Sequence, residues 1–334
     1  MLVPVYNVAP YLRQCVESVL QQADAGVEIL LLDDVSTDAS AAVMQALQRV
    51  AGSRLRLLAH ERNRGLSAAR NTLLEAASGT HVWFVDSDDW LAPGVLPKLS
   101  AILQAQPVPD MVFFDYRVVR ARDWLQYRLK YRLRGEHHRA SLVGAAHCRL
   151  RGGPALLEAV LASGNLFSWA HVSRRALWQA APPLRFPEGR SFEDITTTPR
   201  LTARADSAWH VPEAWVMYRR RDDSISALMS AAKVADLCAA MRGQRDELLA
   251  RFPQLPPSTR VALAHQAARN LMAALRHLRQ LPREEAAALM TSCGEDFYAA
   301  VGEDLPLLQR AYLLRGWWWR AWRLAQALRV TKVA

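Results

Sequence analysis

The first 110 residues alternate between short apolar runs and segments whose apolar residues recur at helical spacing. The apolar runs are 1–5, 27–32, 54–59 and 81–85, and the helical segments are 8–22, 39–50, 65–78 and 95–104. The run 27–32 is nearly continuous Val, Ile and Leu, which is typical of a strand buried on both faces. Strands and helices that alternate in this way form right-handed βαβ units. The sequence therefore predicts an α/β fold, with a mostly parallel sheet flanked by helices.

Carboxylates follow two of these predicted strands. Asp33-Asp34 comes after the run 27–32, and Asp86-Ser87-Asp88-Asp89 comes after the run 81–85. In such sheets ligands bind beyond the carboxyl ends of the strands. Three crowded carboxylates need a compensating cation if they are buried, and their hard oxygens suit Mg²⁺ or Mn²⁺, which could also coordinate a diphosphate. The alternatives are a solvated acidic turn at 86–89 and simple helix capping by Ser36 or Asp38.

Residues 63–71 open a predicted helix with Gly65 and several small side chains. Small residues let the backbone approach a ligand, and Arg64 or Arg70 could neutralise phosphate charge. A helix start with close packing explains the same pattern, so on its own this segment leaves both interpretations open.

The charge balance favours an anionic partner, because the formal net charge is +10. A phosphate-bearing substrate and an acidic membrane surface fit this balance, whereas no nucleic-acid-binding motif accompanies the basic residues. The four cysteines are far apart and lack metal-ligand spacing. No signal peptide and no run of 18 or more apolar residues is visible, so we expect a cytoplasmic protein that is soluble or peripherally attached to the membrane.

The motifs together resemble the family 2 glycosyltransferases. Over residues 1–110 the resemblance rests on Pro4-Val5-Tyr6-Asn7, Asp33 to Asp38, Asn63 to Asn71 and Asp86 to Trp90, in this order and at this spacing. It continues through Asn165 to Trp169, Ser173 to Arg175, Phe192-Glu193-Asp194-Ile195, and Tyr218 to Arg221 with Ser224 to Ser226, and so covers about two-thirds of the chain. The resemblance implies a GT-A fold and inverting sugar transfer from a nucleotide-diphosphate donor.

The resemblance also implies roles for individual residues. Asp194 is expected to be the general base, with Glu193 as its structural neighbour. Asp86 and Asp88 form the D-x-D pair, and either Asp88 or Asp89 ligates Mn²⁺ or Mg²⁺ directly. The expected donor-binding residues are Pro4, Tyr6, Asp33, Asp34, Asn63, Arg70, Asp86, Arg220 and Arg221. Among these, Tyr6 and Asp34 would contact the nucleoside, Arg70 would lie close to the nucleotide or diphosphate, and Arg220 or Arg221 would hold the departing diphosphate.

The implied partners are a donor, with UDP-sugars favoured, and a glycan or lipid-linked acceptor of capsule, exopolysaccharide or lipopolysaccharide synthesis. Two alternatives stay open: a non-catalytic scaffold with the same fold, and a nucleotidyltransferase. The latter normally carries a Gly-rich basic loop after the first strand, where this sequence has Tyr6-Asn7-Val8. Only Met1-Leu2-Val3 precede Pro4, so we expect a short first strand.

Three regions are expected along the chain. Residues 1–110 would form the donor-binding half of the GT-A domain, 111–227 the acceptor-binding half, and 228–334 a helical region broken at 253–257, 282 and 306. Residues 120–139 are expected to be an insertion or a long connection.

The segment 312–330 contains four tryptophans and four arginines but no acidic residue. As a helix it would place Trp318, Ala321, Trp322, Ala325 and Leu328 on one face. Trp and Arg together suit an interfacial helix on an anionic membrane. The alternative is a terminal helix docked on the protein, with its arginines in water.

Overall fold

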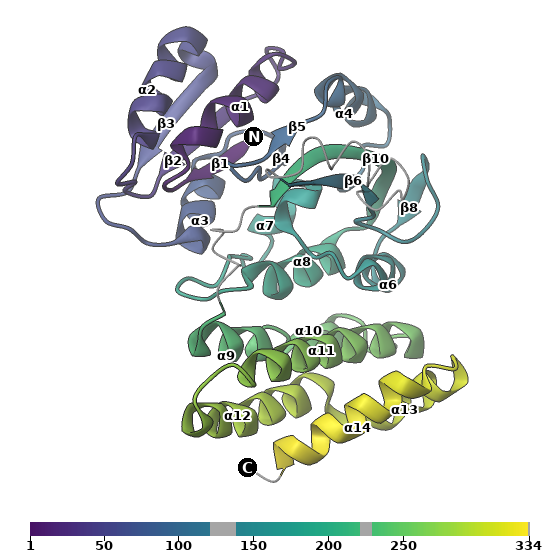
Figure 1. The fold of residues 1–334 in the computed structure, drawn as a ribbon. Helices are drawn as coiled ribbons and strands as arrows, with labels where there is room; N and C mark the ends of the chain where they lie inside the picture. Colours follow the sequence, from purple (N-terminus) through teal and green to yellow (C-terminus); the bar gives the residue numbers. More distant parts are fainter. Residues whose placement is uncertain (121–137, 221–228, 333–334) are drawn as a thin grey trace, which may run out of the picture.

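The computed structural model describes residues 1–120, 138–220 and 229–332 (Figure 1). The strands are β1 Leu2–Val5, β2 Ile29–Asp33, β3 Leu55–Ala59, β4 His81–Val82, β5 Trp90–Leu91, β6 Met111–Arg120, β7 His138–Arg139, β8 Arg149–Arg151, β9 His171–Arg174 and β10 Ser207–Arg220. The helices are α1 Ala9–Leu20, α2 Ser40–Ala51, α3 Leu66–Ala76, α4 Val95–Gln104, α6 Pro154–Ser163, α7 Arg175–Gln179, α8 Glu193–Arg204, α9 Ala231–Ala239, α10 Gln244–Arg251, α11 Pro257–Leu278, α12 Arg283–Val301, α13 Leu305–Leu314 and α14 Trp318–Lys332.

Strands β1, β2 and β3 form a parallel sheet in that order, as the alternation predicts. Successive side chains point to opposite faces of a strand. On one face Val3 and Leu31 pack with Leu12 of α1. On the other face Leu30 and Leu32 pack with Leu73 of α3. Helices therefore cover both faces, and this is why the run 27–32 is apolar throughout. β1 is short, as expected.

The second sheet is mixed, with the order β4-β9-β6-β10-β5 and with β7 and β8 attached to β6 and β10. Among its described strands, β6 and β10 run parallel and the other pairs run antiparallel. The predicted parallel pairing thus holds in the first sheet and does not extend to most of the second. Antiparallel neighbours need no crossover helix, so the alternation of helix and strand carries no signal for them.

The two sheets meet at β1. The amide of Leu2 donates to the carbonyl of Trp83 at 2.8 Å, and the amide of Val85 donates to the carbonyl of Leu2 at 2.9 Å. The predicted strand 81–85 therefore has two partners. Its first half is β4, which pairs with β9, and its second half pairs with β1. The acidic segment Asp86 to Asp89 follows immediately, at the junction of the two sheets.

The hydrophobic core is continuous across the expected region boundaries. Val3 shares one cluster with Phe114 and Trp215, so the halves 1–110 and 111–227 have a common core. A second cluster runs from Leu30 to Leu271 of α11, in the helical region. The division into three regions therefore stays a prediction about the sequence, since no gap in the core marks it within the described residues.

The helical region is built from α9 to α14, and its breaks lie at prolines as predicted. Pro257 begins α11, Pro282 precedes α12, and Pro306 lies in the first turn of α13. Proline is tolerated there because the first-turn amides have no partner within the helix. Figure 1 shows α12, α13 and α14 at the end of the molecule farthest from the sheets.

Candidate active site

One buried arginine joins three carboxylates from distant parts of the chain. The Nη1 atom of Arg70 lies 2.6 Å from Oε1 of Glu193 and 3.1 Å from Oδ1 of Asp194. Its Nη2 atom lies 3.0 Å from Oδ1 of Asp86. Helix α3, the segment after β4 and the first turn of α8 thus converge on a single guanidinium. We call Arg70, Asp86, Glu193 and Asp194 the Arg70 cluster.

The approach of α3 to this cluster is set by Asp34. Its Oδ1 accepts from the amide of Arg64 at 2.9 Å, and its Oδ2 accepts from the amide of Gly65 at 2.7 Å. His60 lies 2.6 Å from the same carboxylate through Nδ1. A carboxylate at a helix N-terminus satisfies unpaired amides and interacts favourably with the helix dipole. The end of β2 therefore fixes the start of α3, and with it the direction of Arg70.

The two acidic residues of α8 have raised pKa values. Burial, together with the neighbouring charge of Asp194, raises the pKa of Glu193 to about 7. Burial also raises the pKa of Asp194, against the opposing effect of Arg70. The Ser168 hydroxyl donates to Oδ1 of Asp194 at 2.5 Å. Oδ1 thus has two donors, Arg70 and Ser168. These two contacts orient the carboxylate of Asp194.

The backbone just before these carboxylates is strained. Phe192 caps α8 in the left-handed region, with φ 59° and ψ 32°. A bulky residue rarely adopts this conformation, and such residues cluster at functional sites. The other described non-glycine residues with positive φ are Asn7 after β1, Val35 after β2, and His147 before β8. Phe192 is the one that directly precedes two carboxylates of the Arg70 cluster.

The three carboxylates of the acidic segment have different surroundings. Asp86 and Asp88 are half-buried, and Asp86 lies against Arg70. Asp89 is buried, and its Oδ1 accepts from the backbone amide of Arg219 at 2.6 Å. Burial and the charges of Asp88 and Asp86 raise the pKa of Asp89 well above its usual range. Asp89 therefore holds β10 in place, and Asp88 is more exposed to solvent than Asp89.

The carboxylates of the acidic segment suit a divalent cation that binds together with a phosphate-bearing substrate. Within the described residues, no three Asp, Glu, His or Cys side chains already converge as a complete metal site. Oδ2 of Asp89 is buried, however, and has no hydrogen-bond partner among the described residues. Mg²⁺ usually takes one or two carboxylates and completes its shell with phosphate oxygens and water. Asp86 and Asp88 offer this kind of partial ligand set.

We expect Asp88→Ala to affect donor turnover and Asp89→Ala to affect the stability of the fold. Asp88→Ala should abolish metal-stimulated donor turnover. Asp89→Ala leaves the buried Arg219 amide unpaired and should destabilise the fold by about 1–3 kcal/mol. Urea denaturation and donor-turnover assays would measure both effects. Full metal stimulation in Asp88→Ala would contradict the assignment.

The other expected donor-binding residues lie along one edge of the parallel sheet. Tyr6 follows β1 and is 43% exposed. Pro4 is buried inside β1, where it pairs with Leu32. Asn63 is exposed and donates to the carbonyl of Asp34 at 2.9 Å. Asp33 is half-buried and accepts from the amide of Ser36 at 3.0 Å. Both carboxylate oxygens of Asp34 are occupied by the loop that starts α3, so nucleoside contact by Asp34 stays a prediction.

Sequence reasoning missed Arg219. Its Nε donates to the carbonyl of Asp88 at 2.9 Å, and its Nη2 donates to Oε1 of Gln14 at 2.6 Å. The guanidinium lies 4.9 Å from the ring centroid of Tyr11 and 4.7 Å from that of Trp90. Arg220, which was expected to hold the diphosphate, is exposed at the end of β10, and Arg221 lies outside the described residues. Of the described arginines of this segment, Arg219 lies against the acidic turn.

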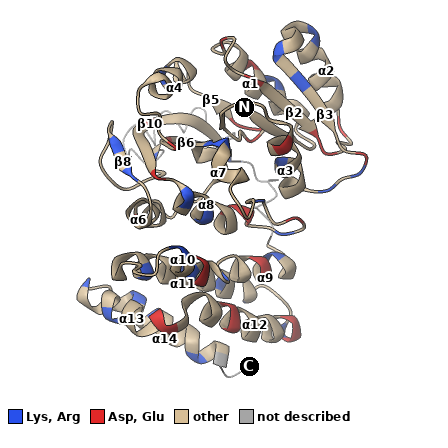
Figure 2. Cartoon of the chain, turned by 180° about the vertical axis from the view of Figure 1, so that it is seen from behind, with Lys and Arg blue, Asp and Glu red and all other residues tan. Residues whose placement is uncertain are grey.

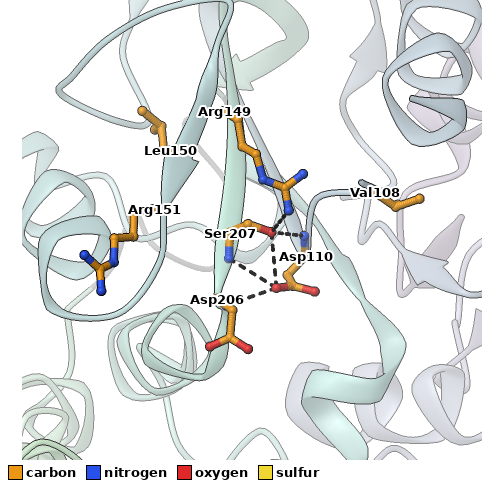
Figure 3. Close-up of a pocket in the computed structure, with 7 residues that line it drawn as sticks. All are labelled: Val108, Asp110, Arg149, Leu150, Arg151, Asp206 and Ser207. Carbon is orange, nitrogen blue, oxygen red and sulfur yellow. Dashed lines mark hydrogen bonds between the residues drawn. The ribbon is translucent and has the colours of Figure 1, made fainter. Parts of the chain in front are cut away.

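A cavity of about 380 Å³ lies elsewhere, and Figure 3 shows its lining. Asp110 accepts from the amides of Asp206 and Ser207, and Arg149 donates to the Ser207 hydroxyl at 2.9 Å. These residues stand where β6 and β10 begin, whereas Arg219 stands near the end of β10. This cavity is thus separate from the Arg70 cluster.

Comparison with known proteins points to one family. Residues 1–157 match the model of the family described as Glycosyl transferase family 2. Glycosyltransferase GlyA of Streptococcus pneumoniae is 28% identical over 256 residues, which are 75% of this chain and 34% of that protein. Glycosyltransferase GlyG of the same organism is 27% identical over 67% of this chain and 71% of its own length. The chain spans only about a third of the first curated relatives, GlyA and the Bacillus subtilis protein EpsJ.

Solved structures share the fold of the whole chain. Staphylococcus aureus TarS 1–349 in complex with UDP superimposes with a TM-score of 0.70 at 20% identity, covering 99% of this chain and 89% of that one. The mannosyltransferase PcManGT of Pyrobaculum calidifontis superimposes with a TM-score of 0.54 at 19% identity, covering 99% of this chain and 85% of that one. The predicted GT-A fold is confirmed. The predicted resemblance to the family 2 glycosyltransferases is confirmed over residues 1–157.

Proposed function

We propose that the chain is an inverting glycosyltransferase that moves a sugar from a nucleotide-diphosphate donor to an acceptor hydroxyl in surface-polysaccharide synthesis. The observation that carries the proposal is the Arg70 cluster. One guanidinium holds Asp86, at the expected donor side, 3.0 Å away and Asp194, at the expected acceptor side, 3.1 Å away. A donor bound at the acidic turn and a hydroxyl beside Asp194 would then be neighbours.

The proposed step needs a base because a sugar hydroxyl is a poor nucleophile at neutral pH. Oδ2 of Asp194 takes the hydroxyl proton as the acceptor oxygen bonds to the anomeric carbon. The bond between that carbon and the diphosphate oxygen breaks, and its electron pair leaves with the nucleoside diphosphate. Attack from the opposite face inverts the anomeric centre. Ser168 and Arg70 hold the other oxygen of Asp194, so its carboxylate stays oriented.

The departing diphosphate carries the negative charge that develops in this step. A Mn²⁺ or Mg²⁺ ion held by Asp86 and Asp88 would supply electrostatic stabilisation there. PcManGT was solved with GDP-Man and Mn²⁺, and TarS with UDP and with UDP-GlcNAc. These relatives support a metal-assisted reaction and favour a UDP-sugar as the donor. For the acceptor we propose a glycan or a lipid-linked intermediate.

The proposed base predicts the pH dependence of the rate. A raised pKa means that Asp194 picks up its proton at a higher pH than an ordinary aspartate, so the acid limb of kcat/KM should lie above about pH 4. Glu193→Gln should leave this limb nearly in place, because Glu193, whose pKa is about 7, is already mostly protonated at that pH. A pH–rate profile of both proteins measures the limb. An acid limb at or below the pKa of an ordinary aspartate would contradict the assignment.

A donor-turnover screen tests the proposed function. The full chain is incubated with a panel of UDP-, GDP-, dTDP- and CMP-sugars, and release of the free nucleotide is measured with Mn²⁺, with Mg²⁺ and with EDTA. We expect one donor class to be turned over, EDTA to abolish turnover, and added Mn²⁺ or Mg²⁺ to restore it. Turnover of no donor would favour a non-catalytic scaffold.

A further inference from the structure

The outward face of α14 is unusually rich in tryptophan. Trp318, Trp319 and Trp322 are 70%, 66% and 51% exposed. Arg323 is exposed beside Trp322, and Arg329 and Val330 are exposed about two turns further along the same helix. At 1.5 Å per residue these exposed positions span about 18 Å. Leu313 and Leu314, at the end of α13, are also exposed. We call these eight residues the tail face.

The packing of α14 against the rest of the protein does not explain why its outer side carries large apolar side chains. α14 docks through its other side, where Leu324, Ala327 and Leu328 are buried against the helical region. The predicted single apolar face is therefore split, because Leu328 points inward while Trp318 and Trp322 point outward. The outer side of a docked helix is ordinarily charged or polar. Most of the exposed large hydrophobic side chains among the described residues nevertheless belong to the tail face.

Positive charge gathers beside the tail face. The guanidiniums of Arg320 and Arg315 lie 4.2 Å and 5.3 Å from the ring centroid of Trp317. Burial and the charges of Arg269, Arg320 and Arg315 lower the pKa of the adjacent His265 to about 4, so the three arginines are close together. Within the described residues, none of the three forms an ion pair with a carboxylate. The sequence contains no acidic residue after Asp304, and Figure 2 shows basic residues recurring along α13 and α14.

We infer that the tail face docks on the surface of an anionic phospholipid bilayer. Tryptophan suits the boundary between lipid headgroups and acyl chains, and arginine pairs with lipid phosphates. Among the residues that the structure describes, no helix qualifies as a membrane-spanning segment. Because α14 lies at the end of the molecule away from the sheets, docking there leaves the Arg70 cluster uncovered (Figure 1).

Vesicle flotation with the full chain tests this inference. One set of vesicles contains equal parts of phosphatidylglycerol and phosphatidylcholine, and the other contains phosphatidylcholine alone. We expect about tenfold more protein to float with the anionic vesicles, and high salt to reduce this difference. The triple variant Trp318→Ala, Trp319→Ala, Trp322→Ala should lose about nine-tenths of the binding. The matched control is Val50→Ala with Val143→Ala, which removes two exposed hydrophobic side chains elsewhere and should float like the wild type.

Three results would overturn the inference. The first is a wild-type chain that does not float with anionic vesicles. The second is a folded triple variant that floats as well as the wild type; if that variant fails to fold, Arg323→Glu with Arg329→Glu takes its place and should also lose binding. The third is a wild-type chain that forms a dimer without lipid, as measured by light scattering, and does not float, together with a triple variant that is a monomer. That result would assign the tail face to a second copy of the chain.

Discussion

Asp194→Asn is expected to lower kcat for sugar transfer by roughly 10²- to 10⁴-fold, the usual contribution of a general base. The amide has nearly the same shape as the carboxylate but cannot take the acceptor proton. Donor affinity should change by less than about threefold, because Asp194 acts on the acceptor side. Steady-state transfer assays and calorimetric titration of the donor measure the two quantities separately.

A matched control separates this effect from a general loss of charge. Glu75→Gln removes a 63%-exposed carboxylate that pairs with Arg185 and does not contact the Arg70 cluster, and it should leave kcat unchanged. Glu193→Gln is assayed in parallel, since Glu193 lies on the same guanidinium. If Asp194→Asn kept full activity while Glu193→Gln lost it, the roles of the two residues would have to be exchanged.

Arg70→Met is expected to destabilise the fold by about 3–5 kcal/mol, because it leaves buried carboxylates without their cation. The loss should be larger at about pH 8 than at about pH 5. The pKa of Glu193 is about 7, so at the lower pH this group is already mostly protonated and depends less on the guanidinium. Urea denaturation at the two pH values measures the difference.

Two further variants make this test specific to the Arg70 cluster. Arg64→Met breaks an exposed pair with Glu188 and should cost no more than about 1 kcal/mol. Adding Glu193→Gln to Arg70→Met removes one of the uncompensated charges and should recover part of the lost stability. An Arg70→Met variant as stable as Arg64→Met would show that Arg70 does not hold the three carboxylates together.

The sequence predicted the first sheet well, because its signal is local. Both faces of β2 are covered by helices, and this leaves a continuous apolar run that is readable without any tertiary information. The second sheet gave no such signal. β10 pairs with β6, β5 and β8, which lie far away in the sequence, and the choice of these partners depends on tertiary packing.

The position of Arg219 beside the acidic segment shows a second limit. Side chains alternate along a strand, so a one-residue slip turns each of them to the other face. β10 has register shifts between Val211 and Ala214 and again between Ala214 and Val216. Bulges of this kind cannot be counted from the sequence, and the face on which an arginine emerges beyond them could not be predicted.

Arg70 is expected close to the nucleotide or diphosphate, and this stays a prediction. Its position in a small-residue helix start suggested a phosphate ligand. In the structure its partners are three carboxylates, two of which are more than a hundred residues away in the sequence. Contacts at that separation leave no local pattern. The clustering of acidic motifs at the ends of elements indicated a site, and only the fold shows that one guanidinium connects them.

Crystals grown with Mn²⁺ and a UDP-sugar that is turned over test the central claim most directly, through the anomalous scattering of manganese. We expect one strong peak at the carboxylates of Asp86 and Asp88, with the diphosphate on the ion and the sugar facing Asp194. A peak in the cavity lined by Asp110 and Ser207, or a bound nucleotide away from the Arg70 cluster, would contradict the account.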